Sequence, residues 1–158
     1  MKNNFDVLAT RSIELGNSLP IMPIDEIRLS VEFSELPEQR EVVGRLVREL
    51  FNHENMHVRR IAVNACRRSR HFDVPDLESA LTERLADSEH WVCYDAAWAI
   101  KDAEYDNPKI RELLLKNAAS VQLPDDEVRL QSRRGDAQLQ AQVQARKTLD
   151  ALLQRSGG

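Results

Sequence analysis

The sequence has 158 residues, enough for one domain that buries about two-thirds of its unfolded surface. It contains only 5 Gly and 6 Pro, helix-forming residues dominate, and the net charge is −4, so we expect a mostly helical fold. Its two cysteines, Cys66 and Cys93, stand at no disulfide or zinc spacing, which indicates a reducing, cytoplasmic setting. Residues 1–20 contain no long apolar run, so we expect neither a signal peptide nor a membrane span there.

The first 36 residues carry two different periodicities. Residues 5–17 are able to form a helix, whereas apolar and polar residues alternate strictly between Ile27 and Phe33. Such alternation is typical of a half-buried strand, and residues 5–15 are the nearby segment with which it could pair. We therefore expect residues 1–36 to form a small β-hairpin or an irregular cap over the helices that follow.

A pattern of small apolar residues occurs twice, 34 positions apart. Its copies are Val58, Ala62 and Ala65, and then Val92, Ala96 and Ala99. Each copy is typical of two short amphipathic helices joined by a polar turn, and such a pair buries its apolar side only against a neighbouring pair. We therefore expect an all-α stack of helix pairs in residues 37–158.

Helical periodicity and capping residues divide this second segment into individual helices. Proline at a first helical position, and Asp or Asn just before one, mark helix starts. We expect helices over about 38–52, 56–69, 76–85 and 89–102. Asn107-Pro108 starts another, with Ile110, Leu113, Leu114 and Ala118, and a last one follows Asp136, with Ala141, Ala145, Leu149 and Leu152 on one side. Between the last two, residues 123–129 look like the opening of a degenerate third copy.

The second helix of each pair resembles the HEAT repeat, in which an Asp-rich turn leads into Val-Arg and spaced alanines. Residues 53–59 and 87–93 occupy that place, and the resemblance covers roughly residues 40–119. It implies a short HEAT-like α-solenoid that binds protein, or sometimes nucleic acid, along its second helices; a few such proteins attach bilin pigments or remove damaged DNA bases. In the first copy, Arg59 keeps the arginine of the family. In the second copy, Cys93 stands at the matching position, which departs from the usual Asp–Arg ladder between repeats.

Charge is distributed unevenly along the chain. Residues 40–70 hold eight Arg and three Glu, whereas residues 71–107 hold two basic and ten acidic residues. An acidic region of this kind attracts basic partners. The alternative is that solvated helix faces simply differ in sign.

The acidic region also contains three aromatic residues at helical spacing. Trp91, Tyr94 and Trp98 fall on one side of the expected helix, near Asp95 and Asp102. Tyr and Trp among acidic residues are typical of a hot spot for a basic protein, although all three could instead pack between repeats. We therefore expect a non-catalytic module, such as an immunity, inhibitor or adaptor protein, that binds a basic toxin or enzyme and needs no cofactor.

A second group of candidate partner-binding residues lies on the basic helix. Arg59, Arg60 and Arg67 belong to the partner-binding set that we expect. The basic face between Arg59 and Arg70 also supports an alternative function, phosphate contacts to nucleic acid. No aromatic stacking platform is interleaved with these arginines, so the chain favours a protein partner.

The motif His53-Glu54-x-x-His57 supports an enzymatic alternative. On one continuous helix, two histidines four residues apart would share a zinc ion, and the glutamate would be the general base of a metallopeptidase. The repeat pattern instead places these residues in a polar turn, and no third ligand is evident. Since the sequence also lacks a phosphate loop or nucleophile elbow, we expect neither a metal site nor catalysis.

Overall fold

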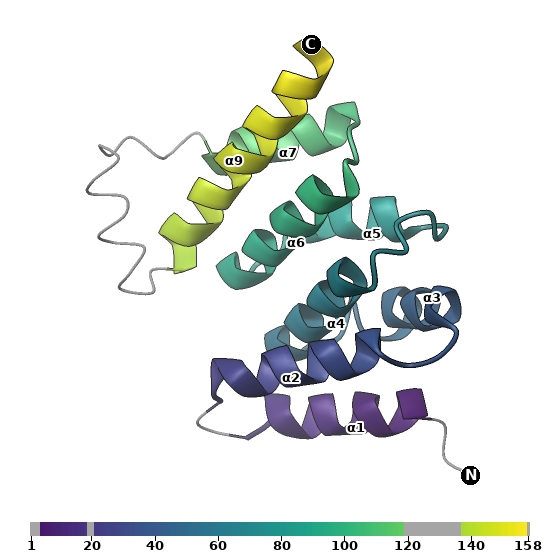
Figure 1. The fold of residues 1–158 in the computed structure, drawn as a ribbon. Helices are drawn as coiled ribbons and strands as arrows, with labels where there is room; N and C mark the ends of the chain where they lie inside the picture. Colours follow the sequence, from purple (N-terminus) through teal and green to yellow (C-terminus); the bar gives the residue numbers. More distant parts are fainter. Residues whose placement is uncertain (1–3, 19–20, 119–136, 158) are drawn as a thin grey trace. The chain divides into compact units, whose positions relative to one another are not determined.

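The computed structural model describes residues 4–18, 21–118 and 137–157, and every regular element in them is a helix (Figure 1). The expectation of an all-α chain is therefore confirmed. The helices are α1 (Asn4–Gly16), α2 (Pro23–Ser34), α3 (Gln39–Glu49), α4 (Met56–Ser69), α5 (Leu77–Arg84), α6 (His90–Ala103), α7 (Pro108–Ala118) and α9 (Ala137–Gly157). None of these described helices has both the length and the apolar character that crossing a membrane requires.

The fold divides into two compact units, Met1–Ala80 and Leu81–Gly158, with the boundary inside α5. The expected division into a cap over residues 1–36 and a repeat domain over 37–158 remains a prediction.

Helix α4 is the centre of the first unit, because α1, α2 and α3 all contact it. Its buried side carries Val58, Ala62 and Ala65, the small residues of the repeat pattern. Such residues allow helix axes to approach to about 8–10 Å. Phe5 of α1 and Phe33 of α2 meet edge to face with ring centroids 5.3 Å apart, which closes the core beneath α4.

The expected β-hairpin at the N-terminus is wrong, because both of its segments are helices. Figure 1 shows α1 and α2 running in opposite directions side by side. Pro23 occupies the first turn of α2, where its missing N–H costs nothing, and two acidic residues in that turn complement the helix dipole. Leu29 and Phe33 are buried four residues apart, whereas Ile27 is exposed, so the apparent alternation arose from apolar residues on two sides of one helix.

Side-chain hydrogen bonds stand at or just before the starts of three later helices, α4, α6 and α7. The Asn55 side chain accepts a 2.8 Å hydrogen bond from the His57 N–H at the start of α4. Asp87 accepts one of 2.9 Å from the Glu89 N–H just before α6, and Asn107 accepts one of 2.8 Å from Ile110 in α7. These local bonds satisfy backbone donors that have no partner within the helix, which explains why the helix starts were predictable.

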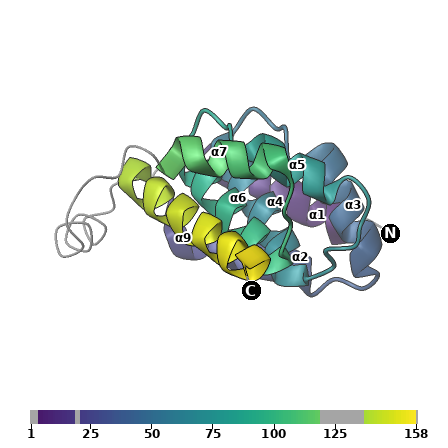
Figure 2. The same ribbon diagram turned by 90° about the horizontal axis from the view of Figure 1, so that it is seen from above.

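In the second unit, α9 packs against both α6 and α7, as Figures 1 and 2 show. The expected apolar side of α9 is confirmed at Ala141, Ala145 and Leu152, whereas Leu149 is only half-buried. The polar side chains of Gln144 and Thr148 are buried on this side as well. The degenerate copy expected at residues 123–129, and Asp136, lie outside the described residues.

Candidate functional site

The aromatic residues of α6 lie along one side of the helix, as their spacing predicts. Tyr94 meets Trp91 edge to face at 5.4 Å and Trp98 at 5.8 Å between ring centroids. All three side chains are half-buried. We call Trp91, Tyr94 and Trp98 the aromatic stripe. Edge-to-face contacts hold the rings in a defined arrangement and contribute about 0.5–1.5 kcal/mol per pair beyond burial.

The two expected acidic partners of the stripe have different surroundings. Asp95 is only 1 % exposed, so its carboxylate is buried and is not available to a partner. Asp102 stands one helical turn after Trp98 and is half-buried, while Glu89, just before the helix, is exposed. Burial of an ionised carboxylate is costly unless hydrogen bonds compensate. The signal that we missed is helical spacing, because Asp95 stands three residues after Val92 and four before Ala99, on the side that both bury.

The three arginines expected to bind a partner have structural contacts on α4. Arg59 is largely buried, and its Nη1 donates to the carbonyl oxygens of His53 at 2.9 Å and Glu54 at 3.1 Å. It therefore closes the turn that precedes α4. Arg60 forms a 3.2 Å salt bridge with Glu26 of α2. Arg67 Nε donates to the Asn64 side chain at 3.4 Å.

The residues of the zinc-peptidase motif do not share a helix, because the chain turns between α3 and α4. His53 and Glu54 precede α4, and only His57 lies in it. His53 Nδ1 accepts a 3.1 Å hydrogen bond from the Asn55 N–H, while the His57 ring contacts the Glu26 carboxylate. The expected location in a turn is thus confirmed for His53 and Glu54, whereas His57 lies in the first turn of α4. Within residues 4–18, 21–118 and 137–157, no three His, Cys, Asp or Glu side chains gather as metal ligands would.

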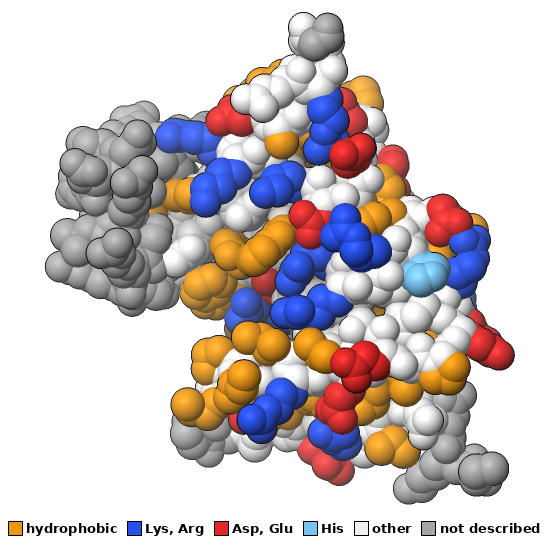
Figure 3. Space-filling view, in the orientation of Figure 1, with side chains coloured by type: hydrophobic (Ala, Val, Ile, Leu, Met, Phe, Trp, Pro, Cys, Tyr) orange, Lys and Arg blue, Asp and Glu red, His pale blue; other side chains and the backbone are white. Residues whose placement is uncertain are grey.

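The outer side of α9 is basic, a feature that we did not predict. Arg146, Lys147 and Arg155 are exposed on this helix, and Figure 3 shows Lys and Arg side chains spread over it. Arg155 lies 3.9 Å from Glu104 and donates to the Lys101 carbonyl at 3.4 Å, which ties its end to α6. The second unit therefore carries positive charge close to Glu104, which directly follows α6.

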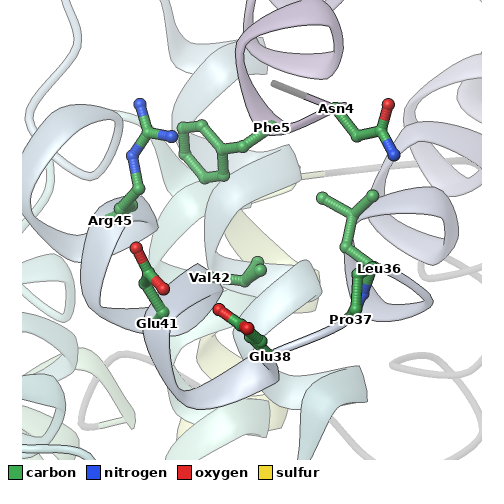
Figure 4. A pocket seen from close by; sticks show the side chains of 8 residues that line it. All are labelled: Asn4, Phe5, Leu36, Pro37, Glu38, Glu41, Val42 and Arg45. Atoms are coloured by element: carbon green, nitrogen blue, oxygen red, sulfur yellow. The ribbon is translucent and has the colours of Figure 1, made fainter. Parts of the chain in front are cut away.

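A pocket of about 320 Å³ opens in the first unit (Figure 4), also missed from the sequence. Its wall includes the Arg45 guanidinium, which lies 4.0 Å from the centroid of the Phe5 ring. Hydrogen bonds to Glu49 and Asp6 raise the pKa of Arg45 above its already high value. The lining residues are Asn4, Phe5, Leu36, Pro37, Glu38, Glu41, Val42 and Arg45, and none of them is Ser, Thr, Cys, Lys or His.

Both cysteines are buried thiols. Cys66 lies in the core, and burial raises its pKa far above the ordinary value. Cys93 is 8 % exposed, and burial, together with the negative charge of Asp87, raises its pKa to about 11. Its Sγ donates to the Asp87 carbonyl oxygen at 3.2 Å. Neither thiol is therefore a thiolate nucleophile near neutral pH.

No family model, curated protein or solved structure matches this chain. The resemblance to HEAT repeats therefore depends on the two internal copies alone.

Proposed function

We propose that this chain is a non-catalytic protein-binding module with a short HEAT-like arrangement of helix pairs. The observation that carries the proposal is the aromatic stripe, in which three half-buried rings are held by two edge-to-face contacts on one side of α6. Rings that are already ordered lose little conformational entropy on binding. Trp and Tyr are also the residues most enriched among binding hot spots.

A basic partner fits this surface best. Asp102 follows the stripe by one turn, Glu89 precedes it, and residues 71–107 carry ten acidic against two basic residues. Opposite charges steer association and fix the orientation of a partner. The basic outer side of α9 would repel such a partner, so we expect the contact to be confined to α6. Within this class, an immunity, inhibitor or adaptor protein for a basic toxin or enzyme is the most specific proposal.

The absence of an activated side chain at the candidate sites supports a binding role. Both thiols have raised pKa values. The imidazoles of His53 and His57 contact separate groups, Asn55 and Glu26. Arg59, expected to contact a partner, instead closes a turn. We therefore assign Arg59 a structural role within the proposal.

The test starts from partner identification and continues with purified components. Tagged protein would capture partners from the source cells, and the affinity of the purified partner would then be measured by calorimetry for Trp98→Ala and Asp102→Lys. We expect either change to weaken binding by roughly 30-fold or more, as at a hot spot of about 2 kcal/mol. Leu153→Ala, which removes an exposed apolar side chain from α9 of the same unit, serves as the matched control.

Three results would refute the proposal. The first is unchanged affinity of the Trp98 and Asp102 variants that retain the helical circular dichroism of the parent. The second is bound zinc together with a peptidase activity that Glu54→Gln abolishes. The third is salt-dependent binding of an oligonucleotide, which would assign the chain to nucleic acid instead.

A further inference from the structure

A second apolar surface lies on the outer side of α2 in the first unit. Met22, Ile24 and Ile27 are 55 %, 49 % and 44 % exposed, and Val31 is half-buried. Ile24, Ile27 and Val31 follow one another at three and four residues, so they share one side of the helix. We call these four residues the α2 strip. Figure 3 shows hydrophobic side chains gathered over the N-terminal end of α2.

Two arginines border this strip. Arg28 stands one turn after Ile24 and is exposed. Arg68 of α4 is also exposed, and its Nε donates at 3.1 Å to the hydroxyl of Ser30, which lies one turn after Ile27 on the opposite border of the strip. In the part of the chain that the structure describes, neither arginine forms a salt bridge with a carboxylate. Within the described part of this unit, the exposed apolar side chains and the two arginines are therefore available to a partner that offers both an apolar side and carboxylates.

We propose that the α2 strip binds an acidic amphipathic helix of a partner protein. The apolar side of that helix would cover Ile24 and Ile27, and carboxylates on its two flanks would pair with Arg28 and Arg68. Binding of this kind uses apolar anchors at i, i+3 or i+4, and i+7, and flanking charges fix the register. An α-helix about 10 Å wide matches a single strip bordered by charge on both sides.

The surroundings favour a helix over an anionic membrane. A bilayer presents a plane of negative charge much wider than the strip. Asp25, Glu32 and Glu35 lie on or directly after the same helix, so a broad anionic surface would meet like charges. A narrow helix reaches only the strip and its two arginines.

This site is independent of the proposed function. It lies in the first unit, it takes a partner of opposite charge to the one proposed for α6, and it uses none of the aromatic stripe. Failure of either proposal therefore leaves the other standing.

The test measures binding of the full-length chain to a panel of fluorescein-labelled synthetic amphipathic helices by anisotropy. The panel has Leu on one side and Glu on both flanks, and matched versions carry Lys in place of Glu or the same residues in scrambled order. We expect the Glu helices to bind, and the Lys and scrambled versions to bind at least about tenfold more weakly. Ile24→Ser with Ile27→Ser, and separately Arg28→Glu with Arg68→Glu, should each weaken the Glu helices at least about tenfold.

Leu115→Ser with Lys116→Glu on α7 provides the matched control, because these residues are an exposed apolar side chain and a neighbouring exposed cation in the other unit. This control should bind the Glu helices as the parent does. The arginine variants change only exposed side chains, so they keep the test valid if the isoleucine variants unfold.

The proposal is overturned if no Glu helix binds, if Lys and Glu helices bind equally, or if the α2 variants bind as the parent does. Binding to vesicles of phosphatidylcholine and phosphatidylserine that the α2 variants lose, without peptide binding, would assign the strip to membranes. A dimer in sedimentation that Ile24→Ser with Ile27→Ser dissociates would assign it to a second copy of this chain.

Discussion

The hydroxyl of Thr148 donates a 2.8 Å hydrogen bond to the carbonyl oxygen of Ala97, 51 residues earlier in the chain. Both residues are buried, Thr148 on α9 and Ala97 on α6. The small side chain of Ala97 lets α9 approach the backbone of α6 closely, and the bond satisfies a hydroxyl that burial has removed from water. Gln144, one turn earlier on α9, donates to the Thr148 oxygen at 3.4 Å and extends this polar contact.

Replacement of Thr148 by valine tests that bond, because it removes the hydroxyl and keeps the shape. We expect Thr148→Val to lower the free energy of unfolding by about 1 kcal/mol, the net value of one buried hydrogen bond. Urea denaturation followed by circular dichroism measures the change. Thr10→Val on the exposed side of α1 is the control and should change stability by less than about 0.5 kcal/mol. Equal stability of the Thr148 variant and the parent would show that the contact has no net effect.

The Glu26 carboxylate connects α2 to α4 through His57 and Arg60. Its side chain is 11 % exposed, whereas that of Glu32, which pairs with Arg11, is 42 % exposed. Hydrogen bonds to charged groups contribute more when water is excluded, so we expect Glu26→Gln to destabilise the protein by about 1.5–3 kcal/mol. Glu32→Gln, the matched control, should cost less than about 1 kcal/mol. Thermal unfolding measures the stability of both variants. Similar losses of stability in Glu26→Gln and Glu32→Gln would contradict this prediction.

Substitution of Arg59 tests whether this arginine has a structural role or binds a partner. Because its guanidinium donates to two turn carbonyls, Arg59→Leu should cost about 1.5–3 kcal/mol of stability. Arg48→Leu, at an exposed position of α3, should change stability by less than about 0.5 kcal/mol. If Arg59→Leu leaves the unfolding free energy unchanged and instead abolishes binding of a partner, the arginine belongs to the binding surface.

The buried Cys93 thiol should make the protein less stable in alkali. Its pKa in the folded chain is about 11, above the ordinary value of 9.0, so the folded state holds the proton more tightly than the unfolded state. The resulting stabilisation is present below pH 9 and is lost as the pH rises towards 11. As the pH rises over this range, the unfolding free energy of the parent should therefore fall relative to that of Cys93→Ala. A difference that stays constant between pH 8 and about pH 11 would contradict the assignment.

Helices that begin with local signals were the predictable part of this fold. Asn55, Asp87 and Asn107 each accept a hydrogen bond from a backbone N–H two or three residues later. The expected range 56–69 coincides with α4, and α7 begins at Pro108, where Asn107-Pro108 predicted a helix start. The shared side of the three aromatic residues on α6 followed from helical geometry in the same way.

The N-terminal segment shows where local patterns mislead. Apolar residues on two sides of α2 produce the alternation of a strand, and only the packing of Leu29 and Phe33 in the core distinguishes the two structures. The pocket beside Phe5 was equally out of reach, because its other wall comes from Arg45, which is 40 positions later in the sequence. No spacing rule connects residues so far apart.

The sequence by itself determined the helical class, the helix starts after Pro37 and the residues that share a side of each helix. These features depend on capping bonds and on a 3.6-residue period, both of which act within a few neighbouring positions. Only the tertiary structure decided that Arg59 closes a turn and that Ile24 and Ile27 remain exposed. Burial depends on which distant helix packs against each side, and that choice is made by the whole chain.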